Sequence, residues 1–161
     1  MRRFVRIGVA MSVLALLAIQ PAFRSHAVSD DEYSAKLVGT WAGTYIDEGR
    51  GEKQYGEKTY CPDGTASGFI VYYEWVREEG YREHERYFFK SRWKIENGIL
   101  FAFDIVFYPK PWTGAKILKD RILEMTEDKA VFADLEYGDI FERSRIASST
   151  WKQRCSIRPA V

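Results

Sequence analysis

From residue 38 onward, short β-prone runs recur between turn signals, with no internal repeat and no interdomain linker. Short runs with polar boundaries are typical of the strands of all-β proteins. The runs predict eight or nine antiparallel strands in meander order, and the clearest are VGTWAGTYI, KQYGEKTYC, GFIVYYEWV, RYFFKSRWKIE, ILFAFDIVFY, KILKDRILEMT, AVFADLEY and IFERSRIA. Hairpin-linked strands suit an antiparallel up-and-down β-barrel of about eight strands, because closure removes exposed sheet edges.

Turn signals divide these runs at defined points. Asn97–Gly98 is a pair that favours a type I′ hairpin turn. Pro109 and Pro111 have no amide N–H, so strand pairing should stop at about Tyr108. The charged segment 77–86 predicts a solvated hairpin tip, since it is polar throughout apart from Gly80 and Tyr81.

The N-terminus has the order of a secretory signal. A basic start precedes an uncharged, mostly apolar run at residues 7–19, and Ser25 and Ala27 supply the small residues that a signal peptidase reads. The run is short for a membrane-spanning helix, which needs about 20 residues. We therefore expect residues 1–27 to be removed, with an uncleaved anchor as the alternative. Residues 28–161 then form one exported domain without a transmembrane segment, periplasmic or extracellular.

The expected domain opens with DDEYSAKL (residues 30–37), which predicts a short helical turn capped by Asp30 or Asp31. Four arginines and no acidic residue precede position 28, so the formal net charge falls from +1 for the whole chain to −3. A weakly acidic domain lacks the basic footprint of a nucleic-acid-binding protein. Nucleic acid is therefore not an expected partner.

Both cysteines of the chain, Cys61 and Cys155, follow the expected cleavage point. An even pair of cysteines in an oxidising compartment predicts a disulfide. Because it would close a long loop, the chain-entropy model gives at most roughly 4 to 5 kcal/mol of stabilisation. Metal binding is the rival interpretation, but only His84 remains after cleavage and no further Cys or His lies near it.

Candidate chemistry is sparse, and the sequence predicts no catalytic residue, metal site or cofactor. Asp104 is the exception, because it interrupts the apolar run ILFAFDIVFY. Turned inward, it would be desolvated and its pKa would rise, as in an acid of an isomerase or cyclase. Turned outward, it would pair with Lys119 or Arg121 of the next strand. Alternation favours the outward position, with an inward set of Phe101, Phe103, Ile105 and Phe107.

Aromatic residues supply a candidate pocket. A barrel of about eight strands is just wide enough to be filled by side chains or to hold one small ligand. Alternation predicts a ligand-binding set, with Tyr73 as its polar handle, that comprises Phe69, Val71, Tyr73, Trp75, Phe101, Phe103 and Phe107. The alternative is that these rings simply fill the core.

The opening run LVGTWAG, which follows the short helical turn, resembles the Gly-x-Trp opening of lipocalins and of the small lipocalin-like domains of secreted bacterial proteins. Four later segments resemble further motifs of those domains in the expected order, namely CPDGTASG, SRWKIENGILF, ILEMTEDKAVF and FERSR. The resemblance covers roughly residues 35–146, and it implies ligand binding rather than catalysis.

The same resemblance implies that Trp41 lies across one end of the barrel. Gly39 and Gly43 on either side leave room for the indole ring. An arginine of the closing strand should stack on this ring, and we expect Arg143, with Arg145 as the alternative. A cation over an indole contributes about 0.5 to 2 kcal/mol.

These observations predict a secreted lipocalin-like protein that binds a small apolar or amphipathic ligand. Two alternatives remain open. One is a filled barrel that contacts a protein partner or an envelope surface through the charged segment 77–86. The other is a barrel isomerase or cyclase that uses Asp104.

Overall fold

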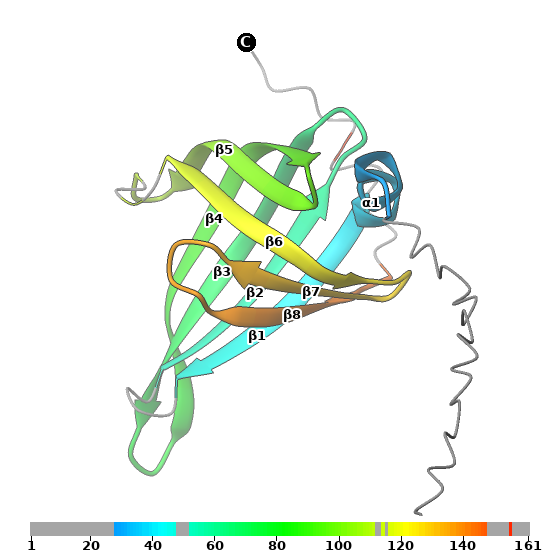
Figure 1. Cartoon of the computed structure of the whole chain (residues 1–161). Coiled ribbons are helices and arrows are strands. Elements are labelled where there is room, and N and C mark those ends of the chain that lie inside the picture. The colour runs from blue at the N-terminus through cyan, green and yellow to red at the C-terminus, as the bar shows by residue number, and fades with distance from the viewer. Residues whose placement is uncertain (1–27, 48–51, 112–113, 115, 148–154, 156–161) are drawn as a thin grey trace, which may run out of the picture.

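The computed structural model describes residues 28–47, 52–111, 114, 116–147 and 155. One helix precedes eight strands: α1 (Asp30–Leu37), β1 (Gly39–Asp47), β2 (Glu52–Tyr60), β3 (Thr65–Val76), β4 (Gly80–Glu96), β5 (Ile99–Tyr108), β6 (Ile117–Met125), β7 (Lys129–Asp134) and β8 (Ile140–Arg145). Each strand pairs antiparallel with the next, and β8 pairs with β1, so the sheet closes into a barrel in meander order (Figure 1). The predicted all-β, lipocalin-like barrel with a short N-terminal helix is confirmed.

The expected signal segment, residues 1–27, lies outside the described residues. Within the described part of the chain, no helix has the length and apolar character needed to cross a membrane.

The two ends of the barrel differ. Figure 1 shows α1 at one end and the long β3–β4 hairpin reaching past the other strands at the opposite end. The apolar core gathers at the α1 end, from the helix and the adjoining ends of seven strands: Leu37, Trp41, Tyr60, Ala66, Trp93, Ile95, Leu100, Ile122, Met125, Ala130 and Phe132. Side-chain packing therefore fills the barrel beside the helix.

The cap of α1 differs from the prediction. Ser29, not Asp30 or Asp31, is the N-cap, and its Oγ accepts a hydrogen bond from the amide of Glu32 at 3.1 Å. The Asp30 carboxylate instead accepts the amides of Asn97 at 2.7 Å and Gly98 at 2.9 Å. It thereby ties the helix to the β4–β5 turn.

Both turn residues, Asn97 and Gly98, have positive φ, 55° and 70°. A type I′ turn requires this conformation, so the hairpin prediction is confirmed. The strand that follows ends at Tyr108, directly before Pro109, as expected.

Strand β5 contains an irregularity that the alternation pattern did not predict. Asp104 has a φ of +53°, and the β4–β5 register shifts between Lys90 and Arg92. Before the shift, Leu100 and Ala102 are the buried residues. A bulge of this kind moves the side chains beyond it to the opposite face of the sheet.

The predicted inward set of β5 is therefore wrong for Phe101 and Phe103. Their rings instead lie under outward cations of β4, Lys94 and Arg92. Phe107, beyond the bulge, does face inward and packs on Phe89 with ring centroids 5.6 Å apart.

Asp104 itself is exposed, as the outward alternative required. Among the described residues, however, it forms no ion pair with Lys119 or Arg121. The register explains this, because the β5–β6 ladder stops at Phe103, one residue before the aspartate.

Arg145, not Arg143, covers Trp41. The guanidinium carbon of Arg145 lies 4.4 Å from the centre of the indole ring, and the two residues are direct partners in the β1–β8 ladder. Trp41 is fully buried, and its Nε1 donates to the carbonyl of Leu37 at 2.7 Å. The expectation for Arg143 is wrong because that residue lies two positions earlier on β8, beside Gly43.

Arg145 also joins three segments at this end of the barrel. Its guanidinium donates to the carbonyls of Lys36, Val38 and Glu127. Gly39 gives it space, because a Cβ atom there would collide with Nη1 of Arg145, and the φ of Gly39 is +132°. The first glycine of the opening motif is thus needed for the arginine rather than for the indole.

The predicted disulfide is confirmed. Cys61 and Cys155 are bonded, with their Cα atoms 5.4 Å apart and a separation of 94 positions in sequence. The bond joins the chain just after β2 to the C-terminal segment.

We expect Arg145→Met to lower the free energy of unfolding by about 3 kcal/mol, because it removes the cation–π contact and leaves three carbonyls without their donor. Urea denaturation followed by tryptophan fluorescence measures this change. Arg143→Met is the matched control, since it removes the same charge from the same face of β8. Equal losses in the two variants would contradict the role assigned to Arg145.

Candidate functional site

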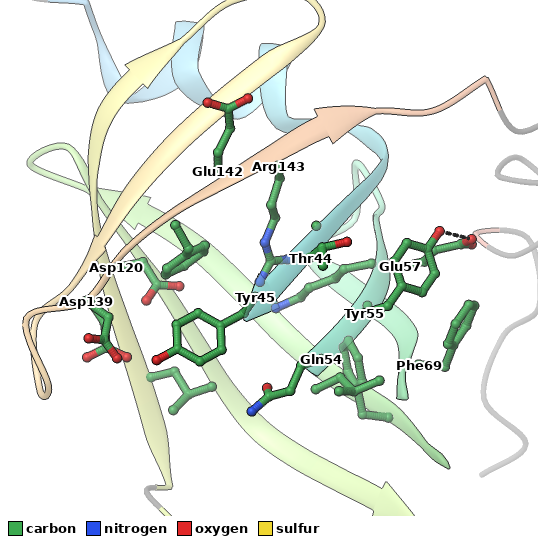
Figure 2. Close-up of a pocket in the computed structure, with 18 of the residues that line it drawn as sticks. Thr44, Tyr45, Gln54, Tyr55, Glu57, Phe69, Asp120, Asp139, Glu142 and Arg143 are labelled. Carbon is green, nitrogen blue, oxygen red and sulfur yellow. Dashed lines mark hydrogen bonds between the residues drawn. The ribbon is translucent and has the colours of Figure 1, made fainter. Parts of the chain in front are cut away.

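Beyond the apolar core, the barrel is open. A cavity of about 580 Å³ lies between strands β1, β2, β6, β7 and β8, with β3 and β4 contributing further walls (Figure 2). Its apolar walls are Ile70, Phe89, Leu118 and Phe141. Pockets for small molecules in proteins typically measure 300–1,000 Å³, so the space is large enough for such a ligand. A fully filled barrel is not what the structure shows.

Two features of the sequence create this space. Gly43 and Gly56 are direct partners in the β1–β2 ladder, so no side chains project from that part of the wall. In addition, the described β1–β8 ladder consists of Trp41–Arg145 and Ala42–Ser144 alone. The seam between β1 and β8 is therefore unpaired beyond Ala42, next to the cavity.

Three charged side chains enter the cavity from three strands: Lys58 from β2, Asp120 from β6 and Arg143 from β8. Strand geometry explains each position, because alternate residues share a face. Lys58 lies opposite Trp41 in the register, and Arg143 precedes the inward Arg145 by two. Asp120 lies opposite the buried Leu100.

Aromatic rings flank both cations. The Nζ of Lys58 lies 4.8 Å from the ring centre of Tyr60 and 5.6 Å from that of Phe89. The guanidinium carbon of Arg143 lies 5.2 Å from the ring of Phe141. In Figure 2, Arg143 extends into the cavity while its neighbour Glu142 points the other way.

The three charges are not paired with each other. Among the residues that the structure describes, the side chains of Lys58, Asp120 and Arg143 form no hydrogen bond, and no Lys or Arg nitrogen lies within 4.0 Å of the Asp120 carboxylate. Their donors and acceptors therefore remain available to a molecule in the cavity.

Burial alters the acid–base behaviour of this cluster. Burial, together with the nearby charge of Arg143, lowers the pKa of Lys58 to about 7, against the opposing influence of Asp120. Burial likewise raises the pKa of Asp120, which the two cations oppose. The Tyr60 hydroxyl has a pKa raised to about 12, mainly by burial. With all three charged groups ionised, the cluster carries one excess positive charge.

Polar residues complete the lining. Tyr45, Gln54, Tyr137 and Asp139 also border the cavity. Asp134 borders it as well, but its carboxylate accepts the amides of Glu136 and Tyr137 and so stabilises the β7–β8 turn.

The predicted ligand-binding residues fall mostly elsewhere. Phe69 is part of the cavity border, but its ring lies on the outer face of β3, where it packs against the exposed Phe88 and Arg86. Figure 2 shows it beside Tyr55 and Glu57, which form a hydrogen bond of 2.8 Å. The other predicted lining residues do not border it: Val71, Tyr73, Trp75, Phe101, Phe103 and Phe107. On β3 the inward face carries Gly68 and Ile70, whereas Trp75 is 59% exposed on the hairpin.

Lys58 and Asp120 were not predicted from the sequence, although one signal pointed to Asp120. Leu118, Asp120 and Ile122 share a face of β6, so the carboxylate interrupts an apolar stripe just as Asp104 does in β5. Lys58 gave a weaker signal, because both faces of β2 are polar. Only the pairing of β2 with the Trp41 face of β1 shows that the lysine points inward.

Neither metal-ligating groups nor similarity to known proteins adds an assignment to this cavity. Within the described residues, no group of three or more His, Cys, Asp or Glu side chains is arranged to hold a metal ion. No protein-family model matches the sequence, and no curated protein matches it significantly. The site is therefore interpreted from its own residues.

The lowered pKa of Lys58 has a consequence for stability. Between about pH 7 and pH 10 the unfolded chain holds a proton on this lysine that the folded protein has lost, so stability should rise with pH over this range. We expect Lys58→Met to remove that rise and to stabilise the protein at pH 6 by about 1 to 4 kcal/mol, since a buried charge is replaced by an apolar side chain.

Urea denaturation at pH 6, 7, 8 and 9 tests this expectation. Lys119→Met is the matched control, because Lys119 is an exposed lysine on the outer face of the barrel. Parallel stability–pH curves for Lys58→Met and the unsubstituted protein would contradict the assignment.

Proposed function

We propose that this chain is an exported, lipocalin-like binding protein whose barrel holds a small molecule with an apolar body. The observation that carries the proposal is the open cavity of about 580 Å³ inside a closed eight-stranded barrel. Its walls combine apolar surface with a few convergent polar groups, which is the composition of small-molecule sites. The resemblance of the opening Gly-x-Trp motif to lipocalin-like domains points in the same direction.

Export is part of this proposal. The disulfide between Cys61 and Cys155 supports an oxidising compartment, the periplasm or the extracellular medium. The basic and apolar residues at the start of the chain support the same destination.

The alternative of an interaction protein has less support. Most charges of the segment 77–86 already have partners in this chain, through Arg82 with Glu74 and Glu79, Arg86 with Glu83, and Glu85 with Lys110. Internal pairing leaves fewer charges for a partner. The alternative of an isomerase or cyclase loses its candidate residue, because Asp104 is exposed on the outer face.

A neutral apolar fluorophore, N-phenyl-1-naphthylamine, tests the proposed function. After extraction of co-purified small molecules, we expect saturable fluorescence enhancement with the unsubstituted protein. Gly56→Leu should weaken binding at least about tenfold, equivalent to about 1.4 kcal/mol, because its side chain fills the cavity. A Cβ atom at Gly56 would lie 3.6 Å from Cγ1 of Ile70 on the cavity wall and 3.3 Å from the carbonyl oxygen of Phe69.

Ser144→Leu is the control, since it adds the same side chain at an exposed position of β8. Native mass spectrometry of protein purified from its own host then identifies any co-purified ligand. Absence of saturable binding, or equal affinity in Gly56→Leu, would contradict the proposal.

A further inference from the structure

We propose that the ligand of this cavity is a monoanionic amphiphile, whose single carboxylate lies between Lys58 and Arg143. This inference rests on the proposed function and names the chemical class of the ligand. It follows from the balance and placement of the charged groups, not from the volume of the cavity.

The balance of charges in the cavity favours a ligand with one negative charge. Two cations and one carboxylate enter the cavity from different strands, and among the described residues none of the three is paired within 4.0 Å. The other carboxylates that border the cavity are either exposed, as in Glu52, Asp139 and Glu142, or hydrogen-bonded elsewhere, as in Glu57 and Asp134. Charges that are removed from water and left without partners are costly. One bound carboxylate would neutralise the excess positive charge of the cluster.

The geometry of the two cations favours a carboxylate as the negative group. Ring contacts with Tyr60 and Phe89 position Lys58, and ring contacts with Phe132 and Phe141 position Arg143. Such contacts hold the side chains without using their N–H donors. The planar guanidinium matches a carboxylate through two parallel hydrogen bonds, and the ammonium adds a further donor.

Asp120 restricts the charge that a ligand of this cavity can carry. Its carboxylate enters the same cavity and would repel a second negative charge, so a dianion fits less well than a monoanion. A positively charged ligand would be repelled by Lys58 and Arg143 and attracted by Asp120 alone. Asp120 is instead suited to accept a hydrogen bond from a hydroxyl or amide group on the ligand.

Apolar surface lies beside these charges. Ile70, Phe89, Leu118 and Phe141 line the same cavity. A ligand that places its carboxylate on the cations would lay its body against these side chains. The combination of an apolar wall and an internal cationic pair therefore fits an amphiphile better than a small polar acid.

Displacement of bound N-phenyl-1-naphthylamine by three compounds of equal chain length tests the inference: decanoate, decanol and decylamine, at pH 6. We expect decanoate to displace the fluorophore at least about tenfold more effectively than decanol, because charge-assisted hydrogen bonds form with the carboxylate alone. Lys58→Met and Arg143→Met should each weaken decanoate about tenfold or more. Both variants should leave decanol within about twofold, since its apolar contacts remain.

Two variants serve as controls. Arg121→Met removes one positive charge from an exposed position of β6 and should keep the preference for decanoate. Arg143→Lys keeps the charge but loses the planar fork, so it should retain part of the preference. Binding of the neutral fluorophore reports in each case that the barrel is folded.

The outcomes separate the two proposals. Equal displacement by decanoate and decanol, or a preference that survives in both methionine variants, would overturn the inference while leaving the binding function intact. A preference for decylamine would also overturn it and would identify Asp120 as the anchor. If the fluorophore itself does not bind, the proposed function fails, and this inference fails with it.

Discussion

The guanidinium of Arg145 over the indole of Trp41 is the contact on which the closure of this barrel depends. The two residues are partners in the short ladder that joins the last strand to the first. Three carbonyls, from the end of α1, from the residue after it and from the β6–β7 turn, accept hydrogen bonds from the same arginine. One side chain thus links ring packing, sheet closure and attachment of the helix.

Because the apolar core is concentrated at the α1 end of the barrel, the opposite end contributes less to stability and can hold a cavity. The core beside α1 contains the large buried rings of Trp41, Tyr60 and Phe132. That end can support the fold, while the opposite half carries glycines and unpaired charges that contribute little stability. Burying Lys58 without a partner is a cost that a well-packed core can tolerate, and proteins commonly place such costs at binding sites.

The sequence predicted the architecture better than it predicted the site. Turn residues such as Asn97–Gly98 and Pro109 act through local backbone geometry, so the strand boundaries were largely correct. It was harder to predict which side chains of each strand face the interior, because period-two alternation fails at a bulge. In β5 the positive φ of Asp104 reversed the inward set, and no local signal marked it in advance.

Prediction of the site required the pairing register of the strands, which a single sequence does not specify. Two arginines at positions i and i+2 of β8 share a face and look equivalent in sequence. Their partners on β1 distinguish them, since Arg145 meets Trp41 whereas Arg143 meets Gly43. Lys58 is assigned to the interior for the same reason, because β2 pairs with β1 in a register that places it opposite Trp41.

The disulfide has a topological consequence. Since Cys61 precedes β3 and Cys155 follows β8, the bond encloses six of the eight strands in one covalent ring. A single backbone cut within this ring, for example at the exposed residues Arg77 to Glu79 of the hairpin tip, opens the ring without releasing a fragment. The strands on both sides of the cut remain covalently connected, so a nicked molecule keeps all of its barrel strands together.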